Sequence, residues 1–231
     1  MVPSAERRWS GKTLDARREA RRARLLEVGF ELLGGQGSAA VTVRSVCRHA
    51  RLTDRYFYES FADRDELLAA VYDRVAERAR RALAEAVAHA ERGPELVARS
   101  AVEAFVGLLT ADPRRGRVLL LAPMTDPGLS ARALGLMPMF GELIQAQLAT
   151  QSRRPGAARP GPAPDGRAEP AEPRLTAAAL IGALSNLFIR WLDGSLGIDE
   201  TELTEYCVRK LVHAMPLARP PAPGPGSDDP S

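Results

Sequence analysis

The segment TVRSVCRHARLTDRYFYESF, residues 42–61, fits two short amphipathic helices joined by a tight turn. Thr42 is expected to cap the first helix by accepting a backbone N–H bond. The apolar residues of this helix fall on one face, which we expect to be buried: Val43, Val46, Cys47 and Ala50. Because Ala50 is small, the chain can pack closely just before the turn.

The second helix follows directly. Leu52 is expected to fill the core from the turn, and Thr53 to cap the helix. Phe57 and Phe61 are four residues apart and therefore point to the same side, which we expect to be the core. Helix pairs of this kind occur in many helical proteins, so the pattern alone leaves simple packing and DNA binding both open.

The residues that face outward favour DNA binding. Asp54, Arg55 and Tyr56 form the first turn of the second helix, which in a helix-turn-helix enters the major groove. Arg55 can bond a guanine through two donors, and Asp54 can accept a bond from cytosine. The remaining polar positions suit the flanking phosphates or a base edge. The candidate DNA-binding residues are Thr42, Arg44, Thr53, Asp54, Arg55, Tyr56, Tyr58 and Arg64.

Charge is distributed unevenly along the chain. Residues 1–64 hold 13 arginines and lysines against 8 aspartates and glutamates, whereas the other 167 residues hold 19 against 21. Five arginines fall in one short stretch, residues 17–24. This asymmetry indicates that the N-terminal end meets a polyanion, although a solvated charged face would have the same composition.

Together these residues resemble a known family. The stretch from Arg22 to Val71 is similar to the DNA-binding domain of the TetR family of transcriptional regulators. The matching elements are Thr42-Val43-Arg44, Phe57-Tyr58-Glu59-Ser60-Phe61, Arg64 and Glu66-Leu67. The resemblance implies that Tyr58 contacts a phosphate and that Arg64 does so as well. The turn departs from the family pattern because Arg51 replaces a glycine, which predicts a strained or wider turn.

The rest of the chain is also expected to be helical, since no segment alternates with a period of two. The fold class is therefore all-α: an N-terminal three-helix helix-turn-helix domain followed by a helical ligand-binding and dimerisation domain. The predicted helices are Leu14–Gly34, Thr42–Ala50, Thr53–Phe61, Arg64–Glu91, Glu95–Thr110, Pro113–Ala122, Leu129–Arg153, Leu175–Leu192 and Asp199–Ala214.

Composition sets the domain limits. Residues 1–13 are expected to be a disordered arm, 14–64 the DNA-binding domain, 65–215 the second domain and 216–231 a disordered tail. Within the second domain, the proline- and glycine-rich stretch 154–173 is expected to be a flexible loop.

The helix predicted at residues 175–192 is apolar on almost every side, so it must be buried on more than one side. Either it is the central helix of a monomer, or it also faces a second subunit. The resemblance favours a homodimer. The candidate interface residues are Ala178, Gly182, Ser185, Val208 and Leu211. A dimer predicts a near-palindromic operator, because its two recognition helices must enter successive major grooves.

Several large apolar side chains are candidates for an effector pocket, although any of them can equally be ordinary core. They are Phe105, Leu109, Leu120, Met124, Met137, Phe140, Phe188 and Trp191. Their character favours a small apolar or aromatic effector. We expect a repressor, since a bound dimer can block polymerase, although nothing in the residues excludes an activator.

Other classes of protein fit less well. The three histidines have no metal-ligand spacing, and there is neither a phosphate loop nor a nucleophile elbow, so we expect no enzyme, metal or cofactor. Cys47 and Cys207 are expected to be buried and unpaired. With no signal peptide or membrane span, a cytoplasmic protein is predicted. A helical interaction module that has lost DNA binding remains the second alternative.

Overall fold

In the computed structural model, residues 14–136 and 171–214 are described, and all regular structure in these two ranges is helical. The all-α fold class is therefore confirmed. The helices are α1 (Leu14–Gln36), η1 (Ser38–Ala40), α2 (Val43–Ala50), α3 (Asp54–Tyr58), α4 (Arg64–His89), α5 (Pro94–Ala111), α6 (Pro113–Gly116), η2 (Arg117–Leu121), α7 (Ala122–Thr125), α9 (Ala171–Leu192) and α10 (Glu200–Ala214). Residues 127–136 are helical as well.

Three predicted segments lie wholly or mainly outside the described residues: the arm 1–13, the tail 216–231 and the loop 154–173. One part of the loop prediction is wrong, because α9 already begins at Ala171. Pro173 falls in the first turn of that helix, where backbone N–H groups have no partner within the helix, so proline is tolerated there.

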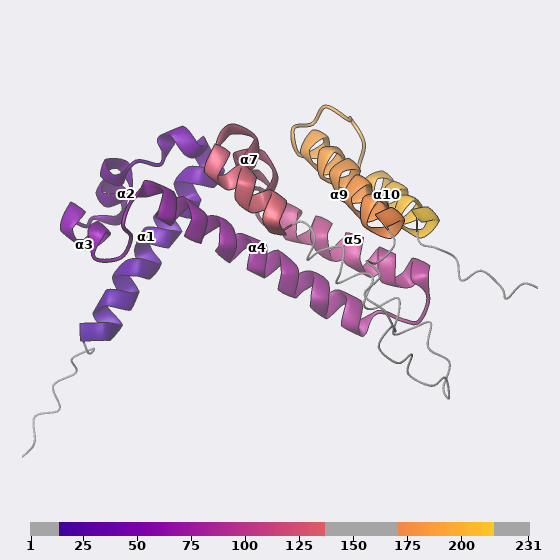
Figure 1. Ribbon diagram of the computed structural model, residues 1–231, viewed down its shortest axis with the longest axis horizontal. Helices are drawn as coiled ribbons and strands as arrows, with labels where there is room; N and C mark the ends of the chain where they lie inside the picture. The colour runs from indigo at the N-terminus through magenta and orange to yellow at the C-terminus, as the bar shows by residue number, and fades with distance from the viewer. Residues whose placement is uncertain (1–13, 137–170, 215–231) are drawn as a thin grey trace, which may run out of the picture.

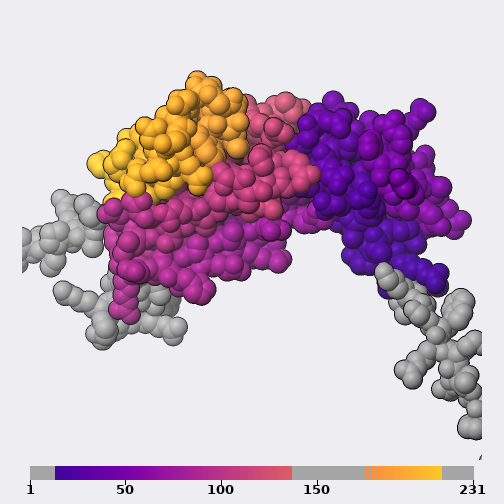
Figure 2. Space-filling view, turned by 180° about the vertical axis from the view of Figure 1, so that it is seen from behind, coloured from indigo at the N-terminus to yellow at the C-terminus, as the bar shows by residue number. Residues whose placement is uncertain are grey.

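The molecule is elongated, with α1, α2 and α3 at one end and α9 and α10 toward the other (Figure 1). The long helix α4 connects the two ends. Its first half packs into a core with α1, α2 and α3, and its second half packs along α5. Helix α5 also packs against α9 and α10 around a separate apolar cluster. In Figure 2 the C-terminal helices cover α4 and α5, away from the N-terminal lobe.

The predicted burial of the two phenylalanines in the helix-turn-helix segment is confirmed. Phe57 and Phe61 are buried together with Val46 and Cys47. On α1, Ala23 is exposed while Leu25 is fully buried. That face of α1 is set by α4, since Gly29 on it lies against the α4 side chains Leu67 and Val71.

Side-chain caps fix where α2 and α4 begin. Thr42 and Ser45 cap each other reciprocally at the start of α2, as predicted for Thr42. Asp63 caps α4 by accepting a bond from the Glu66 backbone N–H at 2.8 Å. Thr53 stands at the N-cap of α3, but its side chain makes no cap bond, so that prediction is wrong. The Tyr56 N–H, which such a cap would bind, donates instead to the Thr53 carbonyl oxygen.

The turn between α2 and α3 is strained rather than wide. Arg51 has φ 56° and ψ 42°, and it is the only residue other than glycine with positive φ in the described part of the chain. The turn is closed by two backbone bonds, from Arg51 N–H to the Arg48 oxygen at 3.3 Å and from Leu52 N–H to the Cys47 oxygen at 3.0 Å. An arginine therefore occupies the left-handed conformation that glycine adopts at lower cost.

Helix α6 lies between the two ends of the molecule and touches both. A methyl group added to Gly34 of α1 would lie 2.6 Å from Arg114 Cβ, and one added to Gly116 would lie 2.5 Å from Leu192 Cδ1 of α9. The sequence predicted that α1 ends at Gly34. In the structure the helix continues to Gln36, and Gly37 follows it with φ 85°. Gly34 serves close packing instead.

Candidate nucleic-acid interface

The first turn of α3 is exposed and is held by a buried aromatic residue on its other side. Asp54, Arg55 and Tyr56 all face solvent, whereas Phe57 is fully buried. The Arg55 side chain is 84% exposed. This arrangement places donors and acceptors outward at the end of the molecule farthest from α10, where a nucleic acid can approach (Figure 1).

Residues on both sides of this turn extend the exposed surface. Thr42 and Arg44 are exposed at the start of α2. Tyr58 is 59% exposed, and its ring packs edge-on against Phe57 with 5.5 Å between the ring centroids. The Tyr58 hydroxyl thus stands on a supported ring, a suitable position for a phosphate oxygen. All of these DNA contacts remain predictions.

Beneath α3 lies the thiol of Cys47. Burial, followed by a hydrogen bond to Asp54 and the charge of Asp54, raises the pKa of Cys47 to about 11. Burial alone raises the pKa of Cys207 to about 11 as well. Both cysteines are buried and unpaired, as predicted.

The arginines of α1 act mainly on the protein itself. Arg18 Nη2 donates to the Glu59 carbonyl oxygen at 2.7 Å, and Arg22 Nη1 donates to the Ser60 carbonyl oxygen at 2.6 Å. Arg24 Nη2 reaches the His49 carbonyl oxygen at 3.4 Å. Carbonyl oxygens at the C-terminal end of a helix lack partners within that helix, so these arginines complete α2 and α3.

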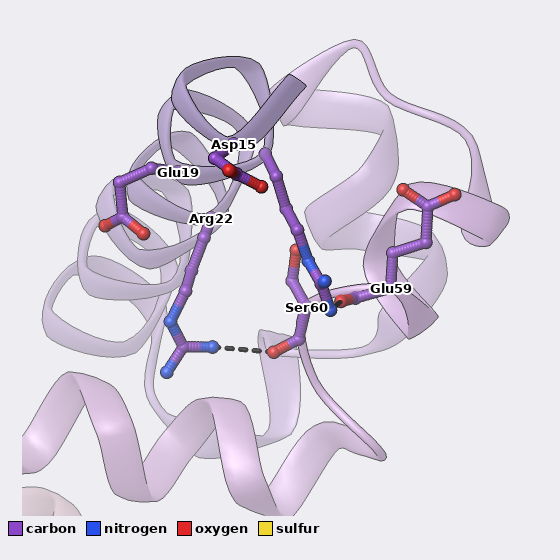
Figure 3. A pocket seen from close by; sticks show the side chains of 6 residues that line it. Asp15, Glu19, Arg22, Glu59 and Ser60 are labelled. Atoms are coloured by element: carbon purple, nitrogen blue, oxygen red, sulfur yellow. Dashed lines mark hydrogen bonds between the residues drawn. The ribbon is translucent and has the colours of Figure 1, made fainter. Parts of the chain in front are cut away.

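Sequence reasoning assigned these arginines to general attraction of DNA and missed their structural role. A usable signal was present, because α3 is too short to satisfy its own carbonyl oxygens and the chain nearby has no C-cap glycine. Figure 3 shows Arg22 reaching across a groove to Ser60. The groove has a volume of about 330 Å³ and is lined by Asp15, Arg18, Glu19, Arg22, Glu59 and Ser60.

Arg64, at the start of α4, makes four contacts within the protein. Its Nε donates to the Val41 oxygen at 2.7 Å, and its Nη2 donates to the Ser38 oxygen at 2.8 Å. It also pairs with Asp65 at 2.7 Å and with Asp126 at 3.3 Å. Asp126 follows α7, so Arg64 joins the segment before α2 to the C-terminal part of the molecule. If Arg64 also contacts a phosphate, as predicted, it must do so with a guanidinium that these four contacts already hold.

The predicted pocket residues do not all come together. Phe105 and Phe188 meet edge-on, with 4.9 Å between the ring centroids. Leu109 is fully buried beside them, and Leu120 and Trp191 pack partly buried against the same cluster. Met124 is 68% exposed, so its assignment to a closed pocket is wrong: it sits in the short helix α7, on the surface of the bundle. Met137 and Phe140 lie outside the described residues.

The predicted dimer residues also separate into two groups. Ala178 and Gly182 of α9 are exposed, and Ser185 is half-buried. Val208 and Leu211 are only 2% and 7% exposed, because α10 directs them into the core that it shares with α5. Their assignment to an interface is therefore wrong, whereas the α9 face remains free in the single chain.

Two features are absent from the described part of the chain. Among residues 14–136 and 171–214, no group of three or more histidine, cysteine or acidic side chains is placed to hold a metal ion. In the same ranges, no helix combines the length and apolarity that crossing a bilayer needs.

The helix pair α2–α3, the outward first turn of α3 and the long connecting helix α4 agree with the helix-turn-helix arrangement that the sequence predicted. Residues 25–71 match the family model described as bacterial regulatory proteins, tetR family. None of the curated proteins matches the sequence significantly. The resemblance of residues 25–71 to the DNA-binding domain of the TetR family is thus confirmed.

Solved structures agree on the fold over most of the chain. A tetR-family transcriptional regulator from Streptomyces coelicolor is 16% identical with a TM-score of 0.63, over 85% of this chain and 81% of that one. A fatty acid degradation regulator from Bacillus halodurans is 14% identical with a TM-score of 0.62, over 83% and 94%. A TetR-like transcriptional regulator from a Rhodococcus species is 19% identical with a TM-score of 0.57, over 84% and 93%.

Proposed function

We propose that this protein is a cytoplasmic repressor that binds a near-palindromic operator as a homodimer and is released by a small apolar or aromatic effector. The observation that carries the proposal is the exposed first turn of α3, held in place by the buried Phe57. In this assignment Arg55 reads a base, and Tyr58 bonds a phosphate. Because base contacts carry sequence choice while phosphate contacts carry register and affinity, the two residues should act differently.

The exposed face of α9 supports the dimer. Ala178, Ala179, Gly182 and Ala183 are exposed on a helix whose Phe188 is buried in the core. A methyl group on Gly182 would meet nothing within 4 Å in the single chain, so a second copy of the helix can approach closely there. Two copies would then carry their α3 helices at a fixed distance, which an operator requires to be about 34–36 Å or a multiple.

The half-buried side chains between α5, η2 and α9 support an apolar effector. Phe105 packs partly buried against all three apolar clusters, so it lies where the cores of the molecule meet. Leu120 and Trp191 are half-buried around the same region. An effector acts only if it binds one of two arrangements of the protein more tightly than the other.

The test is selection of bound sequences from a random DNA pool, followed by affinity measurements with two variants. Arg55→Ala should relax base preference at one position of each half-site, by about 1–3 kcal/mol of discrimination. Tyr58→Phe should weaken binding to all sequences alike. Equal losses on all sequences from both variants would show that α3 is placed wrongly on the duplex.

Two further measurements address the alternatives. Affinity for the selected sequence should fall steeply with salt, because each neutralised phosphate contributes a slope of about −0.9. A helical interaction module without DNA binding would select no sequence at all. Gly182→Glu should yield monomers by light scattering and lose operator affinity, whereas Gly107→Glu, at another glycine with open space around it, should leave the dimer intact.

A further inference from the structure

The carboxylate of Glu59 lies between two arginines from different helices. Its Oε1 accepts a bond from Arg55 Nε at 3.2 Å, and its Oε2 accepts one from Arg21 Nη2 at 3.2 Å. Each arginine therefore uses its own oxygen, so both bonds form together. Arg21 comes from α1, whereas Arg55 belongs to the exposed first turn of α3.

Glu59 is the fixed member of this group. Its backbone carbonyl accepts a bond from Arg18 Nη2 at 2.7 Å, and its side chain is 33% exposed. Arg21, which holds the carboxylate, lies with its guanidinium 4.4 Å from the centroid of the Tyr56 ring. Figure 3 shows the Glu59 carboxylate pointing away from Arg22, so it does not take part in the neighbouring contact across the groove. Arg55, whose side chain is 84% exposed, is the member that faces solvent.

The bond to Glu59 decides which edge of Arg55 is left for DNA. With Nε engaged, the two terminal amino groups stay available as a planar pair of donors. Guanine presents two acceptors, O6 and N7, side by side in the major groove, and the planar pair matches them. A side chain held at its Nε also has less rotational freedom to lose on binding.

We propose that Glu59 is a positioning residue that sets the base preference of Arg55 in favour of guanine. This inference rests on the proposed function, because it takes Arg55 as a base-reading residue. The competing account is purely structural: Glu59 would only tie α3 to α1, and its loss would loosen the domain without changing which base is preferred.

The experiment uses the full chain and the operator selected from a random pool. At the position where Arg55→Ala loses its preference, affinities are measured by competition for all four base pairs, for wild type, Glu59→Ala, Glu59→Gln and the Arg55→Ala/Glu59→Ala double variant. Glu19→Gln is the matched control: Glu19 is an exposed carboxylate that lines the same groove but lies outside the Arg21–Glu59–Arg55 group.

Glu59→Ala should reduce discrimination at that position by about 2- to 5-fold, as expected for an exposed ion pair, and at no other position. Glu59→Gln keeps an acceptor oxygen and should retain part of the preference. The double variant should discriminate no less than Arg55→Ala alone. Removing a negative charge raises affinity for all DNA in Glu59→Gln and Glu19→Gln alike, so the ratio between bases is the readout.

The possible failures are distinguishable. If Arg55→Ala leaves base preference unchanged, the base-reading role in the proposed function is wrong, and this inference falls with it. If Arg55→Ala relaxes the preference while Glu59→Ala and Glu59→Gln change affinity for all four sequences by the same factor, up or down, only the positioning role is overturned. Should Glu59→Ala unfold, Glu59→Gln alone decides the question.

Discussion

Replacing Arg51 by glycine should stabilise the protein, although it removes a side chain from the DNA-binding domain. Arg51 is held at φ 56° and ψ 42°, a conformation that costs a residue with a Cβ atom about 1–2 kcal/mol. Glycine avoids that cost but loses about 0.5–1 kcal/mol more conformational entropy on folding. The side chain is exposed, so its removal costs little. The two ranges leave a net gain of about 0–1.5 kcal/mol, and from their midpoints we expect Arg51→Gly to raise the free energy of unfolding by about 0.75 kcal/mol.

Urea unfolding followed by circular dichroism, at one protein concentration, measures this difference as a shift in midpoint with an unchanged slope. Two variants separate the causes. Arg51→Ala removes the same charge but keeps the strain, so it should give no gain. Arg48→Gly changes an exposed arginine within α2 and should cost about 0.5–1 kcal/mol. If Arg51→Ala stabilises as much as Arg51→Gly, charge repulsion rather than backbone strain is responsible, and the reasoning fails.

Three other perturbations have definite expected outcomes. Arg22→Ala should lower the free energy of unfolding by about 1–3 kcal/mol, since it leaves a helix-end carbonyl without its donor; an unchanged urea midpoint would contradict this. Arg64→Met should lower the free energy of unfolding by a similar amount, about 1–3 kcal/mol, because it removes two donors from backbone carbonyls. It should leave the salt dependence of DNA binding unchanged. A slope of log affinity against log salt that is smaller by about 0.9 would mean that Arg64 also contacts a phosphate. Because burial raises the pKa of Cys47 and Cys207 to about 11 from an ordinary value of 9.0, unfolded thiols lose their protons first. The free energy of unfolding should therefore fall from pH 9 toward pH 11, and fall less in a variant with serine at both positions.

Periodicity and caps were enough to predict the N-terminal fold. Thr42 begins its helix as expected, and the spacing of Phe57 and Phe61 predicted their burial. These features are local, since each depends on residues within one or two turns. The family model matches the same part of the chain, residues 25–71, where the sequence motifs are most specific.

Contacts between distant residues could not be predicted in the same way. The bonds from Arg22 to Ser60 and from Arg64 to Asp126 join residues far apart in the chain. Many other arginines lie in a similar local sequence, so nothing nearby marks these two. Thr53 failed as a cap because a backbone carbonyl took the N–H that its hydroxyl would have bound. Competition of this kind depends on the folded backbone and not on the local sequence.

In the C-terminal helices, a hydrophobic face could be predicted but its partner could not. Val208 and Leu211 lie on an apolar stripe, as the sequence showed, yet the stripe packs onto α5 of the same chain. Met124 is apolar and still 68% exposed. A helical period indicates which side of a helix avoids water, and only the tertiary arrangement decides which surface covers it.

The two glycine contacts of α6 make the link between α1 and α9 depend on the direction of movement. Atoms already in contact resist being pushed together far more steeply than they resist separation. A displacement of α9 toward α6 therefore pushes α6 against α1. A displacement of α9 away from α6 is opposed by attractive contacts and by the 3.3 Å bond from Arg117 Nη1 to the Gly34 oxygen. The close contacts at Gly34 and Gly116 thus transmit compression between α9 and α1 more directly than tension.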